Sequence, residues 1–250
     1  MSAQNDQLAR MMGMSGEQEG GKAPKYNVPI IKFNGNTGEF KKIVYTDGAK
    51  EESAITGELK IVILKNRKRL EAQDAGLSSV EFNSIKQIVT LFSNTDGKFS
   101  KEAVDTVTNL RENYPVLKTQ EVLYVLHDGE ICKLIVKGGS STSFYTFKDA
   151  LKEEGNHSFS VTTKVGVASA KGKVGKKYFY MTFESAPLEV TLDEVESKMT
   201  EVAEAVKKID DYNSGKAMSE TNSSTSVKTV STDVDDIDLD EGINADDIEI

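Results

Sequence analysis

The sequence predicts a mainly β fold with a few helices, held in one body between residues 25 and 190. Short runs rich in β-branched and aromatic residues recur through this body, separated by Gly, Asn and Asp turn signals. Apolar residues at helical spacing occur in only three segments. Hydrophobic residues make up 38% of the chain, which is low for a fully folded protein and is expected when polar ends flank the body.

The body opens with a predicted hairpin. Residues 27–33 and 39–45 are two short β-rich runs around Asn and Gly turn residues, a pattern typical of paired strands. Residues 57–64 form the most strand-like run of the chain, and a basic run follows directly at its end. Residues 71–95 are ambiguous, apart from a strand expected near 85–92.

A helix and a second hairpin are predicted next. Residues 100–113 carry a Ser cap and apolar residues at helical spacing, and Pro115 follows them, so we expect a helix. Residues 121–127 and 130–137 are strand-like runs on either side of Asp128-Gly129, which is a strong hairpin turn signal.

The remainder of the body is predicted to contain one more helix and two more strands. Residues 138–143 are rich in Gly and Ser and predict a flexible loop. Residues 144–154 predict a short amphipathic helix that Gly155 ends. Strands are expected at 158–167 and 178–184, joined by a basic, Gly-containing connection.

Past Pro187, which should end the sheet, the chain changes character. Residues 191–212 are expected to hold an amphipathic helix, because residues 192–209 place apolar side chains on one helical face. The sequence leaves open whether this helix packs on the body or pairs with its copy in a homo-oligomer. Residues 213–231 are a Ser- and Thr-rich linker, and residues 1–24 are expected to be a disordered arm.

The order strand, strand, helix, strand, strand between residues 121 and 184 has a known topological counterpart. A curled sheet with one helix between its third and fourth strands is the topology of an OB-fold, a partly open barrel that binds oligonucleotides on one face and between its loops. We therefore expect residues 25–190 to form an OB-like nucleic-acid-binding domain.

No catalytic or metal-binding pattern is present in the sequence. The chain has two His residues, His127 and His157, and a single Cys, Cys132. A catalytic or metal site needs convergent partners, and the sequence offers none near these residues. The single Cys excludes an internal disulfide, and its place within a predicted strand indicates a core residue. We expect a non-enzymatic protein without cofactor or metal.

Basic residues cluster at two places in the body. Clustered cations release counterions from a phosphate backbone and so bind nucleic acid without sequence preference, and nearby aromatic rings can stack on any base. The sequence leaves open whether these are solvated basic loops beside core aromatics. The candidate nucleic-acid-binding residues are Lys65, Arg67, Lys68, Arg69, Tyr145, Lys164, Lys171, Lys173, Lys176, Lys177, Tyr178 and Tyr180.

Several aromatic and sulfur-containing side chains are expected in the core instead. Phe179, Met181 and Phe183 alternate with the tyrosines at 178 and 180, so they should face the opposite side of the strand. Phe147 lies on the apolar face of its predicted helix. These assignments leave Tyr178 and Tyr180 together on one strand face, beside the basic connection.

Charge is strongly segregated along the chain. The net charge is −9, yet residues 24–190 hold 24 Lys and Arg against 20 Asp and Glu, and residues 232–250 hold nine carboxylates with no Lys or Arg. Such a tail cannot fold alone, because like charges repel and little apolar surface is available. It can serve as a mobile acidic ligand. The candidate partner-binding residues are Asp235, Asp236, Asp238, Asp240, Asp246, Asp247, Ile248, Glu249 and Ile250.

The first 23 residues lack the apolar segment of a secretory signal, and no apolar run approaches the length of a membrane span. We therefore expect a soluble, cytoplasmic protein that does not bind membranes.

The β-rich basic body at 28–184 and the linker that leads to Asp233–Ile250 resemble the phage-type and bacterial single-stranded DNA-binding proteins. The resemblance implies a protein that coats single-stranded DNA in replication or recombination and recruits replication and repair enzymes through its acidic tail. Two features depart from the family: the tail ends in Ile rather than Pro-Phe, and the chain has no Trp to stack on bases.

Two alternatives to single-stranded DNA binding stay open at this point. The first is a phage structural, scaffold or adaptor protein whose β-rich body assembles with copies of itself. The second is a single-stranded RNA-binding protein, because recognition of the 2′-hydroxyl depends on a placement that sequence does not reveal.

Overall fold

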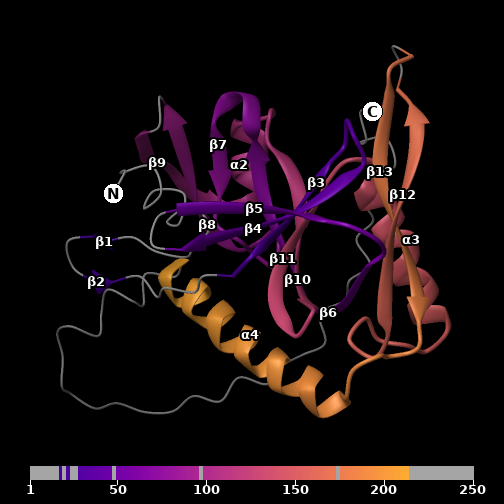
Figure 1. Ribbon diagram of the computed structural model, residues 1–250. Helices are drawn as coiled ribbons and strands as arrows, with labels where there is room; N and C mark the ends of the chain where they lie inside the picture. The colour runs from indigo at the N-terminus through magenta and orange to yellow at the C-terminus, as the bar shows by residue number, and fades with distance from the viewer. Residues whose placement is uncertain are drawn as a thin grey trace, which may run out of the picture.

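The computed structural model describes residues 17–18, 21–22, 28–46, 49–95, 98–172 and 175–213. Over these residues the protein is mainly β with three α-helices, as the sequence predicts (Figure 1). In chain order the elements are β1 (Glu17–Gln18), β2 (Gly21–Lys22), β3 (Ile30–Asn34), β4 (Glu39–Thr46), β5 (Ala49–Ile55), β6 (Leu59–Ala72), the short 3-10 helix η1 (Gln73–Ala75), β7 (Leu77–Ser79), β8 (Ile88–Thr95), β9 (Lys98–Thr106), α2 (Val107–Asn113), β10 (Lys118–His127), β11 (Glu130–Val136), α3 (Gly139–Glu153), β12 (Thr162–Lys171), β13 (Lys177–Ala186) and α4 (Leu192–Asn213).

The main sheet is open and has the strand order β5-β4-β3-β11-β10-β6-β7-β8-β9. Its described pairings are antiparallel except for that of β3 with β11. The strands β12 and β13 form a long hairpin that branches from this sheet through β6. In Figure 1 the hairpin stands beside α3, at the right of the molecule.

The strand β6 is the element on which the fold is organised. Its first residues, Leu59–Ile61, pair with β12, and its longer second part pairs with β10. A register shift lies between Tyr124 and Val125 of β10, where β6 carries an extra residue. A bulge of this kind bends a strand, which lets β6 belong to the main sheet and to the hairpin at once.

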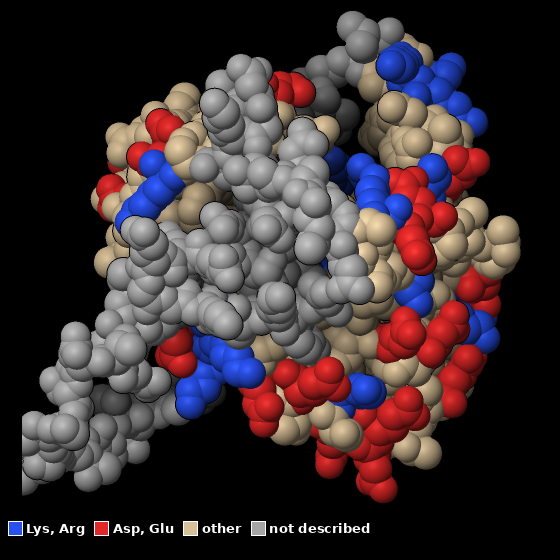
Figure 2. Space-filling model, turned by 60° about the vertical axis from the view of Figure 1, so that its left-hand side comes forward, with Lys and Arg blue, Asp and Glu red and all other residues tan. Residues whose placement is uncertain are grey.

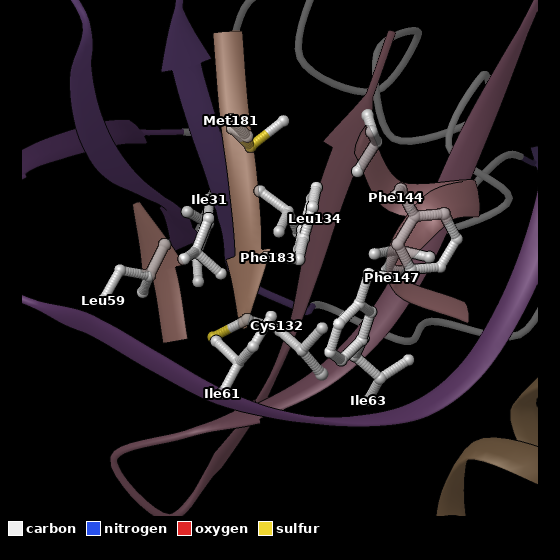
Figure 3. Close-up of a cluster of buried hydrophobic side chains, with 14 of the residues drawn as sticks. Ile31, Leu59, Ile61, Ile63, Cys132, Leu134, Phe144, Phe147, Met181 and Phe183 are labelled. Atoms are coloured by element: carbon white, nitrogen blue, oxygen red, sulfur yellow. The ribbon is translucent and has the colours of Figure 1, made fainter. Parts of the chain in front are cut away.

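The first core cluster lies between the main sheet, the hairpin and α3. Figure 3 shows side chains from β3, β6, β11, β13 and α3 converging there. Phe144 and Phe147 come from α3, and the ring centroid of Phe183 lies 5.4 and 6.0 Å from theirs. Cys132 and Met181 are buried in the same cluster, so the predicted core positions of Cys132, Phe147, Met181 and Phe183 are confirmed.

Two further clusters complete the core. The helix α4 covers the other side of β6 and β10 through Val195, Val202 and Val206. In Figure 1 it runs below the sheet, in the segment for which the sequence predicts an amphipathic helix. The third cluster joins β7, β8 and β9 to α2.

The predicted hairpins are confirmed. β3 pairs with β4 and β10 pairs with β11, in both cases antiparallel. Asp128 and Gly129 have φ of 50° and 76°, and a two-residue hairpin turn with positive φ at both positions matches the right-handed twist of its strands.

The prediction of a helix over residues 100–113 is wrong in its first half. Residues up to Thr106 belong to β9 and pair with β8, and only Val107–Asn113 are helical. Ala103 packs in the third cluster, whereas Val104 is 45% exposed. Adjacent residues on opposite faces are characteristic of a strand. Pairing with β8 therefore makes this segment a strand, although its apolar residues have helical spacing.

The loop predicted at residues 138–143 is also wrong, because α3 begins at Gly139. Gly138 has a φ of 59° and makes the turn into the helix. The Ser140 hydroxyl accepts a hydrogen bond of 2.8 Å from the Met181 backbone N–H. This tertiary contact stabilises the Gly- and Ser-rich segment as the first turn of α3.

Candidate nucleic-acid interface

The β12–β13 hairpin carries the second predicted basic cluster. Backbone pairing continues from Thr162 opposite Ala186 to Lys171 opposite Lys177. Lys171, Lys176 and Lys177 are exposed, and Lys173 lies outside the described residues. Figure 2 shows Lys and Arg side chains gathered at the far end of this hairpin, at the upper right.

Aromatic rings lie directly beside these lysines on both faces of β13. The ring centroids of Tyr178 and Tyr180 are 6.2 Å apart, and both side chains are partly buried. On the opposite face, the Lys177 Nζ lies 4.8 Å from the ring centroid of Phe179. The predicted pairing of basic residues with Tyr178 and Tyr180 on one strand is therefore present. Phe179 is an additional partly exposed ring that the sequence places in the core.

The free edge of β13 is held by two neighbouring segments. The Phe179 backbone N–H donates to the Gly35 carbonyl at 2.8 Å, and the Met181 N–H donates to Ser140. Gly38 has a φ of 76°, and a Cβ there would lie 3.1 Å from Phe179 Cδ1. The β3–β4 turn and the start of α3 thus fix the orientation of the hairpin.

The first predicted basic cluster does not form a single patch. The sequence predicts that Lys65, Arg67, Lys68 and Arg69 follow the end of a strand, but β6 continues through them to Ala72. Alternating residues of a strand point to opposite faces. The four cations are consequently divided between two sides of the sheet.

Arg67 is the clearest correction to the predicted interface. Its side chain is fully buried, and its Nη2 lies 2.7 Å from Asp210 Oδ1 on α4. The same nitrogen donates to the Glu81 carbonyl oxygen at 2.9 Å. A guanidinium held in this way is a structural ion pair, and it offers no surface to a phosphate.

Two further predicted cations are already neutralised. Arg69 pairs with Glu71 at 3.0 Å, and Lys164 pairs with Glu58 at 3.3 Å. These pairs are partly exposed and weak, so a phosphate could displace them at some cost. Lys65 is exposed on β6.

Lys68 points to the other side of the sheet, toward Tyr145 on α3. Its Nζ lies 6.0 Å from the Tyr145 ring centroid, and the Nζ of Lys148 lies 5.8 Å from the same centroid. The Tyr145 hydroxyl donates to the buried carboxylate of Glu121. Burial, followed by the negative charge of Glu121, raises the pKa of Tyr145 far above its ordinary value.

A groove of about 570 Å³ lies at the base of the hairpin, where β12 separates from β6. It is lined by the start of β4, the β5–β6 connection and residues 165–167 of β12. Its lining includes Glu39, Lys41 and Glu58, and Glu58 is the partner of Lys164. The groove thus carries charges of both signs and offers a nucleic-acid backbone no predominantly basic surface.

A buried ionic network centred on Glu81 was missed by the sequence analysis. Lys133 is 3% exposed and donates to Glu81 Oε1 at 2.7 Å, while the Tyr124 hydroxyl donates to Glu81 Oε2 at 2.8 Å. Only tertiary structure brings Lys133 and Glu81 together, since they lie 52 positions apart. The network joins the segment between β7 and β8 to β10 and β11.

The described residues contain no group of three or more His, Cys, Asp and Glu side chains that could hold a metal ion. No helix within them is long and apolar enough to cross a membrane. His127 is nearly buried, with its Nδ1 at 3.0 Å from the Lys60 carbonyl oxygen. The thiol of Cys132 is buried, which raises its pKa to about 11.

The predicted partner-binding tail at 232–250, the linker after Asn213 and most of the arm at 1–24 lie outside the described residues. No protein-family model matches this chain, and neither the curated proteins nor the solved structures contain a match.

Proposed function

We propose that the protein is non-enzymatic and coats single-stranded DNA, with the strand bound along the β12–β13 hairpin. The observation that carries this proposal is the association of Lys171, Lys176 and Lys177 with the rings of Tyr178 and Phe179 on one exposed hairpin. A positively charged surface that follows the backbone, together with aromatic rings for the bases, is the general solution for binding single strands without sequence preference.

The state of the hairpin lysines supports this placement. Lys164 and Arg69 have carboxylate partners, whereas no ion pair involves Lys171, Lys176 or Lys177 among the described residues. Unpaired cations can contact phosphates without first breaking a salt bridge. A phosphate backbone could therefore bind the hairpin without breaking any ion pair that the described residues make there.

The connectivity supports an OB-like interpretation of the body. The chain contains β6, β10, β11, β12 and β13 in this order, with β7, β8, β9 and α2 inserted between β6 and β10 and with α3 between β11 and β12. β6 pairs with β10 and with β12, β10 pairs with β11, and β12 pairs with β13. In an OB-fold the loop between strands four and five is one of the nucleic-acid-binding loops. By this correspondence that loop is the connection between Lys171 and Lys177.

The acidic tail would have two roles under this proposal. With nine carboxylates over residues 232–250, it would compete for the hairpin when DNA is absent. When DNA occupies the hairpin, the released tail would recruit replication or recombination proteins. Ile248 and Ile250 would supply the apolar contacts, and the carboxylates would supply charge complementarity.

The direct test is fluorescence anisotropy of a labelled oligo-dT at several salt concentrations, combined with nuclease protection of the same strand. We expect affinity that falls steeply with salt and protection along the bound length. The absence of binding even at low salt would overturn the proposal and favour the scaffold or adaptor function. Competition by oligo-rU of equal length shows whether DNA or RNA is preferred.

A further inference from the structure

The surface around Tyr145 differs from an ordinary edge of the core. The Tyr145 hydroxyl points inward to Glu121, while its ring is only partly buried on α3. Two lysines approach this ring, Lys68 from β6 at 6.0 Å and Lys148 from the next turn of α3 at 5.8 Å. Cations over a tyrosine face are attracted by its quadrupole, and here two come from different elements.

Glu121 fixes the hydroxyl end of the Tyr145 side chain. The residue is 2% exposed, and one of its oxygens accepts the Tyr145 hydroxyl. The other oxygen, Oε2, is buried and has no hydrogen-bond partner among the described residues. The hydrogen bond to the buried Glu121 carboxylate therefore anchors the Tyr145 side chain in one orientation.

The two lysines remain available to a ligand. No ion pair involves Lys68 or Lys148 within the described part of the chain. A ring fixed by its hydroxyl, with two unpaired ammonium groups at its face, matches one nucleotide of a single strand. The base can stack on the ring, and the flanking phosphates can contact the ammonium groups.

We propose that Tyr145, Lys68 and Lys148 form a second nucleotide-binding subsite, in which Glu121 is the positioning residue for the ring. This inference rests on the proposed function, because it assigns part of the path of the same strand. A Cβ added at Gly139, at the start of α3, would lie 3.6 Å from atoms of both Tyr178 and Tyr180, so these rings lie beside the first turn of α3. Tyr145 lies six residues later, about 9 Å along the helix axis. The strand leaves the hairpin and continues over α3.

The experiment compares oligo-dT with an abasic oligonucleotide of the same length, using anisotropy and the full chain. Tyr145→Leu removes the stacking ring, so affinity for oligo-dT falls about tenfold while affinity for the abasic strand changes little. Lys68→Gln with Lys148→Gln weakens both ligands equally and lowers the salt dependence. The matched control, Lys86→Gln with Lys207→Gln, changes two exposed lysines elsewhere and leaves both affinities unchanged.

Tyr145→Phe keeps the ring and removes the bond to Glu121. We expect its affinity for oligo-dT to lie between those of the wild type and the Leu variant, because the ring is kept but Glu121 no longer fixes it. Circular dichroism of each variant establishes its fold. If the wild type binds and both the Leu variant and the double Gln variant bind with the same affinity as the wild type, the subsite is ruled out and the proposed function still stands. Failure of the wild type to bind either strand would overturn both.

Discussion

Arg67 on β6 and Asp210 on α4 form an ion pair with 2.7 Å between Nη2 and Oδ1, although 143 positions separate them. This pair joins the end of the last described helix to the central strand. The Arg67 Nη2 also donates to the Glu81 carbonyl oxygen, so the guanidinium lies in the same buried network as Glu81 and Lys133. A residue that looks basic and exposed in the sequence is part of the core.

We predict that Arg67→Ala lowers the free energy of unfolding by about 3 kcal/mol, because it removes a fully buried guanidinium that bonds Asp210 and the Glu81 carbonyl oxygen. Urea unfolding followed by circular dichroism measures this change. The double variant with Arg67→Met and Asp210→Leu should recover part of the loss, since it removes both charges. A loss under 1 kcal/mol for Arg67→Ala would contradict the buried pair, and the folded variant should bind oligo-dT with unchanged affinity.

Gly38 provides a test of the contact between the β3–β4 turn and the hairpin. Gly38→Ala combines a positive φ with a Cβ 3.1 Å from Phe179, and we expect a loss of stability of about 2 kcal/mol. Gly57→Ala is the matched control, because Gly57 has a φ of 94° with no atom within 4 Å of the added Cβ. Equal losses of stability for the two variants in thermal unfolding would show that the β3–β4 turn is not in close contact with Phe179.

The buried thiol of Cys132 should make the stability of the folded protein depend on pH in the alkaline range. Burial raises the pKa of this thiol to about 11 from an ordinary value of 9.0, so the folded state keeps its proton after the unfolded state has lost it. Stability from this group is therefore complete below pH 9 and falls between pH 9 and 11, by about 1.4 kcal/mol per pH unit.

Cys132→Ala isolates this effect from the other groups that titrate at high pH. The difference in unfolding free energy between wild type and variant should shrink through that pH range. The same burial should keep the thiol unreactive toward a disulfide reagent at pH 8 in the folded chain. A constant difference across the range, or rapid labelling of the folded protein, would argue against the buried thiol.

Truncation after Ser231 removes all nine carboxylates of the tail. We predict that the shortened chain binds oligo-dT more tightly, by several-fold at low ionic strength, because the tail no longer competes for the hairpin. The gain should fade as salt screens the charges. Anisotropy of both chains over a salt series measures it, and equal affinities at low salt would rule out competition by the tail.

Local patterns in the sequence were sufficient for the parts of the fold that local physics decides. The Asp128-Gly129 turn and the hairpin on either side follow from turn chemistry and alternation. The first half of the predicted helix at 100–113 was wrong because pairing between β9 and β8 is a long-range contact that spacing cannot show. The start of α3 was missed for a similar reason, since Ser140 depends on β13.

The sequence predicts the part of the candidate site whose residues are close together in the chain. It does not predict the part that brings together residues from distant segments. Lys171 to Tyr180 lie on one hairpin, so sequence proximity placed cations and rings together. The partner of Arg67 comes from α4, and Lys148 meets Lys68 only because α3 lies over β6. Charge along the chain does not reveal which face of a strand is covered.

The most direct test of the account is the salt dependence of oligo-dT binding for a variant with Lys171→Gln, Lys176→Gln and Lys177→Gln. Each lost phosphate contact lowers the slope of log K against log salt by about 0.7, so we predict a slope reduced by about 2 and a clear loss of affinity. A control with Lys86→Gln, Lys207→Gln and Lys208→Gln removes the same charge from other exposed positions and should bind as the wild type does. Equal slopes for the two variants would contradict the placement of the strand on the β12–β13 hairpin.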